Sequence, residues 1–71
     1  MTIQELIDQF EIQGAYNIKR WDDELCDCLT LYKGVDFEND KWEFKSKVLN
    51  KKIAYMYAVD GVLNIEIEWG D

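Results

Sequence analysis

Two cysteines are the residues of this chain whose type and spacing come closest to a metal site. Cys26 and Cys28 lie two positions apart, so both thiols would face the same side of a strand. That spacing strains a disulfide but could supply half of a tetrahedral zinc site. A complete site would need four thiolates shared across a dimer, and two small, partly buried thiols are the simpler interpretation. We therefore predict no metal and no cofactor.

Catalytic residues are scarce. The chain has no histidine, which removes the commonest general base. Ser46 is its one serine and lies among lysines, outside any G-x-S-x-G context. The pairs Glu66 with Glu68 and Asp22 with Asp23 could act as acid and base, but the pattern implies no cleft around either pair. We expect a protein that is not an enzyme.

A calcium loop is suggested by Asp36, Glu38 and Asp40, which imitate the first ligands of an EF-hand. Lys41 stands where the glycine is required, and Lys47 where the bidentate glutamate should be. EF-hand binding is therefore rejected.

Charge is segregated along the chain. The net charge of −7 argues against direct binding to nucleic acid, which requires clustered cations. Residues 22–40 are acidic, whereas residues 41–52 are rich in lysine. The two blocks could compensate each other, or the acids could form a docking surface for a basic partner. The acidic candidates are Asp22, Asp23, Glu24, Asp27, Asp36, Glu38 and Asp40.

The N-terminus lacks a secretion signal, and no apolar run approaches the roughly 20 residues that span a bilayer. We expect a cytoplasmic protein that does not bind membranes.

The N-terminal segment predicts an amphipathic helix over residues 2–12. Thr2 and Glu5 have the spacing of a capping box, and Gly14 lies where a left-handed residue would end the helix. Apolar residues recur at helical spacing, at Ile3, Leu6, Ile7 and Phe10.

The middle of the chain is less regular. Residues 15–21 alternate as a strand, whereas residues 22–32 could form either a strand or a helix. We favour the strand because Cys, Thr and Tyr suit a pleated surface and residues 22–24 suit a hairpin loop. Trp42 and Phe44 suggest a short third strand, and Ser46 could cap one helical turn through Asn50.

The segment from Ile53 to Trp69 predicts a β-hairpin that turns at Asp60 and Gly61. A two-residue loop pairs Val59 with Val62. The expected core face holds Ala54, Met56, Ala58, Leu63, Ile65, Ile67 and Trp69. The expected solvent face holds Ile53, Tyr55, Tyr57, Val59, Val62, Asn64, Glu66 and Glu68.

These elements predict one α+β domain over residues 1–71. An N-terminal amphipathic helix would pack on a small antiparallel sheet of four or five strands that ends in the C-terminal hairpin.

Three segments carry a family resemblance: MTIQELI, FEIQGAYNIKRW and KIAYMYAVDGVLNIEIEW. The chain resembles small acidic proteins of unassigned function carried on conjugative and phage-derived mobile elements of Gram-positive gut bacteria. The resemblance implies no activity and no binding residues. It implies a context in which small acidic proteins block host defence.

Two functions are expected. The first is an accessory protein that binds an unidentified protein or forms a homodimer, through a sheet edge or through the face around Tyr55, Tyr57, Glu66 and Glu68. The second is an anti-defence inhibitor whose acidic loops occupy a basic nucleic-acid-binding groove.

Overall fold

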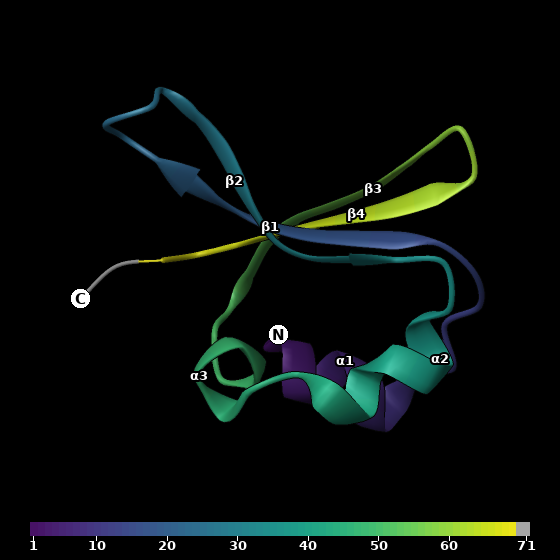
Figure 1. The fold of residues 1–71 in the computed structure, drawn as a ribbon. Coiled ribbons are helices and arrows are strands. Elements are labelled where there is room, and N and C mark those ends of the chain that lie inside the picture. Colours follow the sequence, from purple (N-terminus) through teal and green to yellow (C-terminus); the bar gives the residue numbers. More distant parts are fainter. Residues whose placement is uncertain (70–71) are drawn as a thin grey trace.

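One four-stranded sheet carries all the helices on a single face in the computed structural model, which describes residues 1–69 (Figure 1). In chain order the elements are α1 (Ile3–Gln9), β1 (Tyr16–Asp22), β2 (Asp27–Gly34), α2 (Phe37–Asp40), η1 (Lys41–Glu43), α3 (Ser46–Leu49), β3 (Ile53–Val59) and β4 (Val62–Ile67). The α+β class, the N-terminal helix and the C-terminal hairpin are confirmed.

Helix α1 begins as the sequence predicts. The Glu5 N–H donates to Thr2 Oγ1 at 3.1 Å, and the Thr2 N–H donates to Glu5 Oε1 at 3.0 Å. The helix ends at Gln9, earlier than expected, because Phe10 adopts an extended conformation with φ −134°. Gly14 therefore does not end the helix. It lies in the following loop with φ 93°, where its carbonyl accepts a hydrogen bond from the Phe37 N–H at 3.1 Å.

The sheet is mixed, so the prediction of a purely antiparallel sheet is wrong. Its order is β2-β1-β4-β3, and the two central strands, β1 and β4, run parallel. After β2 the chain crosses one face of the sheet through α2, η1 and α3 and enters β3 at the far edge. Because β4 turns back from β3, it fills the place beside β1 and runs in the direction of β1.

The strand interpretation of residues 22–32 is confirmed, since β1 and β2 form an antiparallel hairpin. Cys26, however, lies in the turn before β2 and has a positive φ of 50°. The expectation that Cys26 and Cys28 share a strand face is therefore wrong.

The third strand expected at Trp42 and Phe44 is absent from residues 1–69. Asp36 accepts a hydrogen bond from the Asn39 N–H at 3.3 Å and starts α2, which continues directly into the 3-10 helix η1. The predicted helical turn forms at Ser46–Leu49 and ends one residue before the expected Asn50, and its N-cap is Lys45 rather than Ser46.

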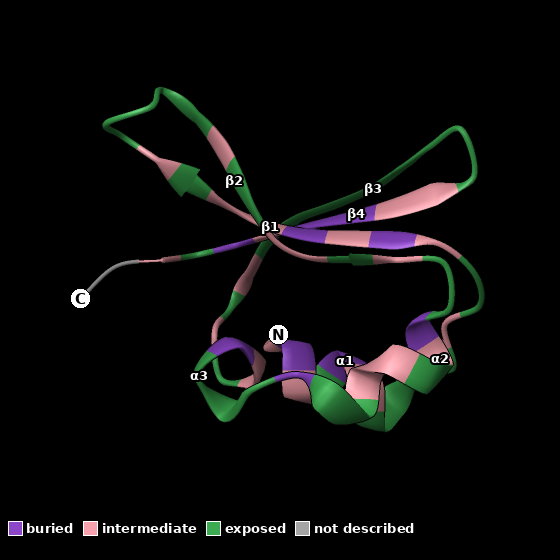
Figure 2. Ribbon diagram, viewed as in Figure 1, coloured by how far each residue is buried: buried purple, intermediate pink, exposed green. Residues whose placement is uncertain are grey.

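An aromatic cluster joins this crossover to the sheet. The rings of Tyr16, Phe37 and Phe44 meet edge to face, with centroids 5.3–5.7 Å apart. The Tyr16 hydroxyl donates to Asp40 Oδ2 at 2.8 Å, and burial together with this carboxylate raises the pKa of Tyr16 well above its usual range. Gly34 is required beside this pair because an added Cβ would lie 2.9 Å from the Tyr16 ring and would also contact the Asp40 carboxylate. Figure 2 shows the buried residues on the strands and helices that face each other.

The C-terminal hairpin has the predicted turn, and its register is as predicted from Tyr55 to Val59. Asp60 and Gly61 have φ of 51° and 76°, as a type I′ turn requires, and Val59 pairs with Val62. Ile65 and Ile67 are buried as expected, and Trp69 packs against the core.

One side of the hairpin differs from the prediction. Met56 is 48% exposed, and Ala54 and Ala58 are also exposed rather than buried. The twist of the sheet carries the hairpin away from the helices towards its tip (Figure 1). A register shift between Ile53 and Tyr55 also removes Ala54 from its expected place opposite Ile67.

Two aromatic residues of the crossover test this packing. Phe37 is fully buried, so Phe37→Ala is expected to lower the free energy of unfolding by about 3–5 kcal/mol. Trp42 is 78% exposed, so Trp42→Ala serves as the control and is expected to change stability by no more than about 0.5 kcal/mol. Urea unfolding measures both values, and equal losses would contradict the burial described.

Candidate interaction surface

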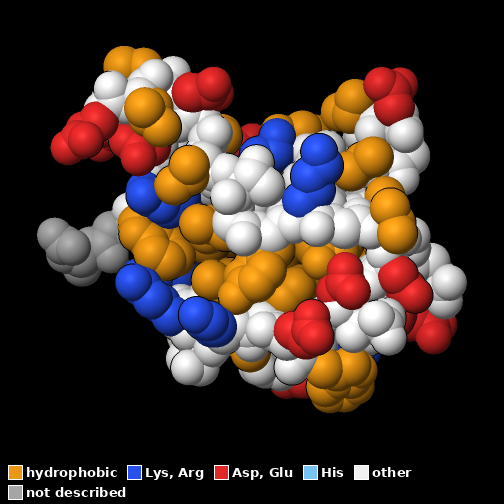
Figure 3. Space-filling model, viewed as in Figure 1, with side chains coloured by type: hydrophobic (Ala, Val, Ile, Leu, Met, Phe, Trp, Pro, Cys, Tyr) orange, Lys and Arg blue, Asp and Glu red, His pale blue; other side chains and the backbone are white. Residues whose placement is uncertain are grey.

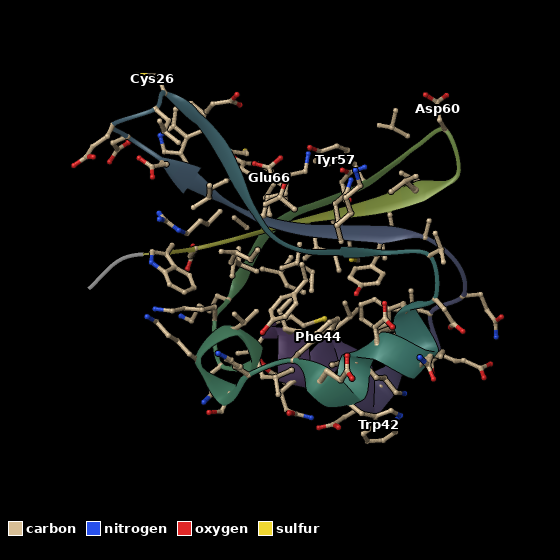
Figure 4. All side chains as sticks on the ribbon, viewed as in Figure 1. Cys26, Trp42, Phe44, Tyr57, Asp60 and Glu66 are labelled. Atoms are coloured by element: carbon tan, nitrogen blue, oxygen red, sulfur yellow. The ribbon has the colours of Figure 1, made fainter. Side chains whose placement is uncertain are left out.

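The face of the sheet opposite the helices is open and holds the predicted residues. Tyr57 and Glu66 point away from the helix layer (Figure 4). Tyr55 is 67% exposed and Tyr57 is 39% exposed. Glu68 is exposed just beyond β4, where its N–H donates to the Lys52 carbonyl at 2.8 Å. The structure thus leaves the candidate residues accessible.

Two neighbours of this face come from the other hairpin. Lys19 Nζ donates to the Tyr57 hydroxyl at 3.3 Å and lies 5.6 Å from the centre of its ring. Cys28 Sγ donates to Glu66 Oε1 at 3.4 Å. Partial burial, together with the Glu66 carboxylate, raises the pKa of the Cys28 thiol. Sequence reasoning missed both contacts because they depend on the strand order.

The centre of the open face holds two asparagines that the sequence did not single out as a pair. Asn17 Nδ2 donates to Asn64 Oδ1 at 3.2 Å, and Asn64 Nδ2 donates to the Val62 carbonyl at 3.1 Å. Asn64 is only 5% exposed, so the expectation that it faces solvent is wrong. Asn17 Oδ1 is buried without a hydrogen-bond partner among the described residues. The two side chains thus link β1 to β4 on this face of the sheet.

The other accessible feature is an apolar groove between α1 and the β3–β4 hairpin. Its volume is about 380 Å³, and one side is formed by Leu6 of α1 together with residues just before and just after this helix. Phe10 and Met56 line it and are about half exposed, at 54% and 48%. The groove is lined by Met1, Leu6, Phe10, Glu11, Ile12, Met56 and Leu63.

The acidic candidates occupy two separate places. Asp22, Asp23, Glu24 and Asp27 lie at the turn between β1 and β2, whereas the other three belong to the start of the helical crossover. Figure 3 shows negative side chains both at that hairpin tip and over the helix layer.

Most of these carboxylates already accept hydrogen bonds within the chain. Asp22 accepts from the Glu24 N–H at 2.9 Å, and Asp23 accepts from the Trp21 ring N–H at 2.7 Å. Glu38 Oε1 lies 2.7 Å from Lys41 Nζ, and its Oε2 accepts from the Ile12 N–H at 2.9 Å. These contacts lower the pKa of Glu38.

The lysine block meets the acidic block at one ion pair described here, Lys41 with Glu38. Lys47 and Lys51 instead lie over the Trp69 ring, at 5.1 and 4.8 Å from its centre, and Arg20 lies at 5.3 Å. Charge compensation between the two blocks is therefore local.

The residues that could bind a metal are dispersed over the described part of the chain. Residues 1–69 contain no group of three or more potential ligands placed to hold a metal ion. Cys26 Sγ lies 3.4 Å from the Asp23 carbonyl, and Cys28 Sγ contacts Glu66, so the two thiols have different surroundings.

No helix within residues 1–69 combines the length and apolar character needed to cross a membrane.

Comparison with known proteins gives no further guidance: no protein-family model, no curated protein and no solved structure matches the chain. The resemblance to small proteins of mobile elements stays a prediction.

The two thiols are expected to differ in reactivity. Cys26 is exposed, whereas Cys28 is half-buried and has a raised pKa, so less of it is thiolate at neutral pH. Iodoacetamide should therefore alkylate Cys26 several-fold faster at pH 7.5, as followed by mass spectrometry of the intact protein and its peptides. Glu66→Gln should accelerate the reaction at Cys28 and leave the rate at Cys26 unchanged. A lower alkylation rate at Cys26 than at Cys28 would contradict the exposures described. An unchanged rate at Cys28 in Glu66→Gln would contradict the contact between Cys28 and Glu66.

Proposed function

We propose that this chain is a non-catalytic protein-binding module that adds an extended strand of its partner to the free edge of β3. The observation that carries the proposal is the composition of that edge. Residues 53–59 read IAYMYAV, without charge or proline, and four large side chains are exposed. Natural sheets normally protect an edge strand with charged side chains or proline, and an apolar edge strand that lacks them can pair with another chain.

The opposite edge of the same sheet provides the contrast. Strand β2 carries Asp27 and Lys33 near its ends, whereas residues 53–59 of β3 carry no charged side chain. Charged side chains on an edge strand discourage the addition of a further strand. The difference between β2 and β3 supports a binding role for β3.

Only the start of β3 is covered. The Ile53 N–H donates to the Met1 carbonyl at 2.7 Å, and Thr2 forms an isolated antiparallel bridge with Lys52. Among residues 1–69, none pairs with the outer side of β3 from Ala54 to Val59. Six residues are the usual length of a strand, so the free stretch can hold a complete partner strand.

The groove lies on the helix side of this edge. Met56 belongs to β3 and also lines the groove, so the two features are continuous. Because side chains alternate along an added strand, every second one would point to the helix side, towards Phe10 and Met56. Hydrogen bonds between the backbones would then supply affinity, and the groove would select which side chains the partner strand can carry.

The expectation of a cytoplasmic location belongs to the same proposal. Its support is that Cys26 and Cys28 are free thiols, as is usual in reducing compartments. The inhibitor hypothesis stays a prediction, since its acidic residues are divided between two places.

A displayed library of random peptides tests the proposal. The wild-type chain should be immobilised at low surface density, so that copies remain separate. We expect it to enrich peptides with alternating apolar residues. Met56→Glu should weaken the binding of these peptides at least tenfold by placing a charge at the groove. Val35→Glu is the matched control, since Val35 is 83% exposed and lies between β2 and α2, and it should leave binding unchanged.

The site of binding is checked by NMR. Titration of a labelled chain with an enriched peptide should shift the amide signals of Met56 and Ala58 more than those of β2. A library that enriches nothing, or peptides that bind both variants equally, would overturn the proposal.

A further inference from the structure

The direction of the backbone groups defines what can pair with β3. In a two-residue hairpin the residues flanking the turn are hydrogen bonded to each other, and the bonded pairs then alternate. The observed register places Val59, Tyr57 and Tyr55 in the pairs that bond to β4. The N–H and C=O groups of Met56 and Ala58 therefore point outwards, away from β4.

We propose that the strand added to β3 is β3 of a second copy of this chain, in antiparallel pairing about a two-fold axis beside Tyr57. This inference rests on the proposed function and names its partner. The two sheets would then form one continuous sheet, and each copy would present the same surface to the other.

Two constraints restrict the position of the axis. Outward-pointing residues must pair with outward-pointing residues, which restricts the axis to a position beside a residue rather than between two residues. An axis beside Met56 would bring Val59 of the second copy opposite Ile53, where Met1 already lies. An axis beside Tyr57 avoids this clash, because the second copy turns away at its Asp60 and Gly61 before it reaches Ile53.

The side chains are self-complementary in this register. On the helix side, Met56 lies opposite Ala58 of the second copy, and the reverse pair is formed by symmetry, so a large residue meets a small one twice. On the open face, Tyr57 meets its own copy and Tyr55 meets Val59. Tyr55, Tyr57 and Val59 are 67%, 39% and 51% exposed, so the pairing buries apolar surface that the single chain leaves in water.

Charge favours the same arrangement. The free stretch has Lys52 just before it and Asp60 just after it, and both residues are exposed. Antiparallel pairing brings Asp60 of each copy opposite Ala54, two positions from Lys52 of the other. The uncharged strand between these ends lets two chains of net charge −7 approach without placing like charges together.

Analytical ultracentrifugation of the wild-type chain is the first test, and we expect a reversible dimer. Ala58→Pro should weaken the dimer at least tenfold because proline removes an outward-pointing N–H that β4 does not use.

Lys52→Glu should weaken the dimer several-fold at low salt by placing a carboxylate beside Asp60 of the second copy. Val35→Glu is again the control and should leave the dimer intact. Thermal unfolding at a concentration where the chain is monomeric verifies that each variant folds.

Disulfide trapping tests the register. With both native cysteines replaced by serine, Tyr57→Cys should give a rapid covalent dimer, because the directly opposed Cα atoms lie about 4.5 Å apart in a non-hydrogen-bonded pair. Val59→Cys is the control and should not cross-link, because its two copies would be offset by four residues, or about 13 Å. Trapping at Val59 but not at Tyr57 would overturn the register and the axis.

The outcomes separate the two proposals. A monomer that still binds library peptides at β3 would overturn self-pairing and leave the proposed function standing. A monomer that binds no peptide would overturn both. A dimer that withstands Ala58→Pro would show that the copies meet elsewhere and would overturn the inference.

Discussion

The packing of Tyr16 against Phe37 and Phe44 is the contact on which the rest of the structure depends. These rings attach the crossover to β1, and the Tyr16 hydroxyl secures it again through Asp40. Because the crossover is held in this position, the chain can enter β3 at the far edge of the sheet and return through β4 to the centre. The buried face of the sheet and the mixed strand order therefore have a common origin.

The exposed surfaces follow from the same arrangement. The helices are short, with seven residues in α1 and four in each of α2 and α3. Adjacent strands are rotated relative to one another, so the tips of both hairpins bend away from a helix layer of this size (Figure 1). Tyr57 and Glu66 consequently lie on an uncovered face, and Met56 lies beside a groove instead of inside the core.

Features encoded by neighbouring residues could be predicted from the sequence. Thr2 with Glu5 and Asp60 with Gly61 act over a few positions, and each produced the expected cap or turn. The parallel pairing of β1 with β4 could not be predicted, because it depends on where a long crossover places a distant hairpin. Phe37 lies within an acidic segment that reads as a loop, so local composition concealed a fully buried ring.

The candidate surface could also be predicted only where it depends on neighbouring residues. Alternation along β3 and β4 indicated that Tyr55 and Tyr57 face water, and they do. The partners Lys19 and Cys28 come from the other hairpin and required the strand order. Met56 was assigned to the core because periodicity shows which side chains share a face but not whether another layer covers that face.

The parallel pair at the centre of the sheet also has a consequence for the folding pathway. Each hairpin joins residues that are close in sequence, whereas β1 meets β4 by pairing Tyr16 with Leu63 and Arg20 with Ile67. Closing this seam requires the ordering of nearly all the intervening chain, and contacts of such long range form slowly. Until β1 and β4 pair, the strand edges that they share in the folded chain are both without a partner.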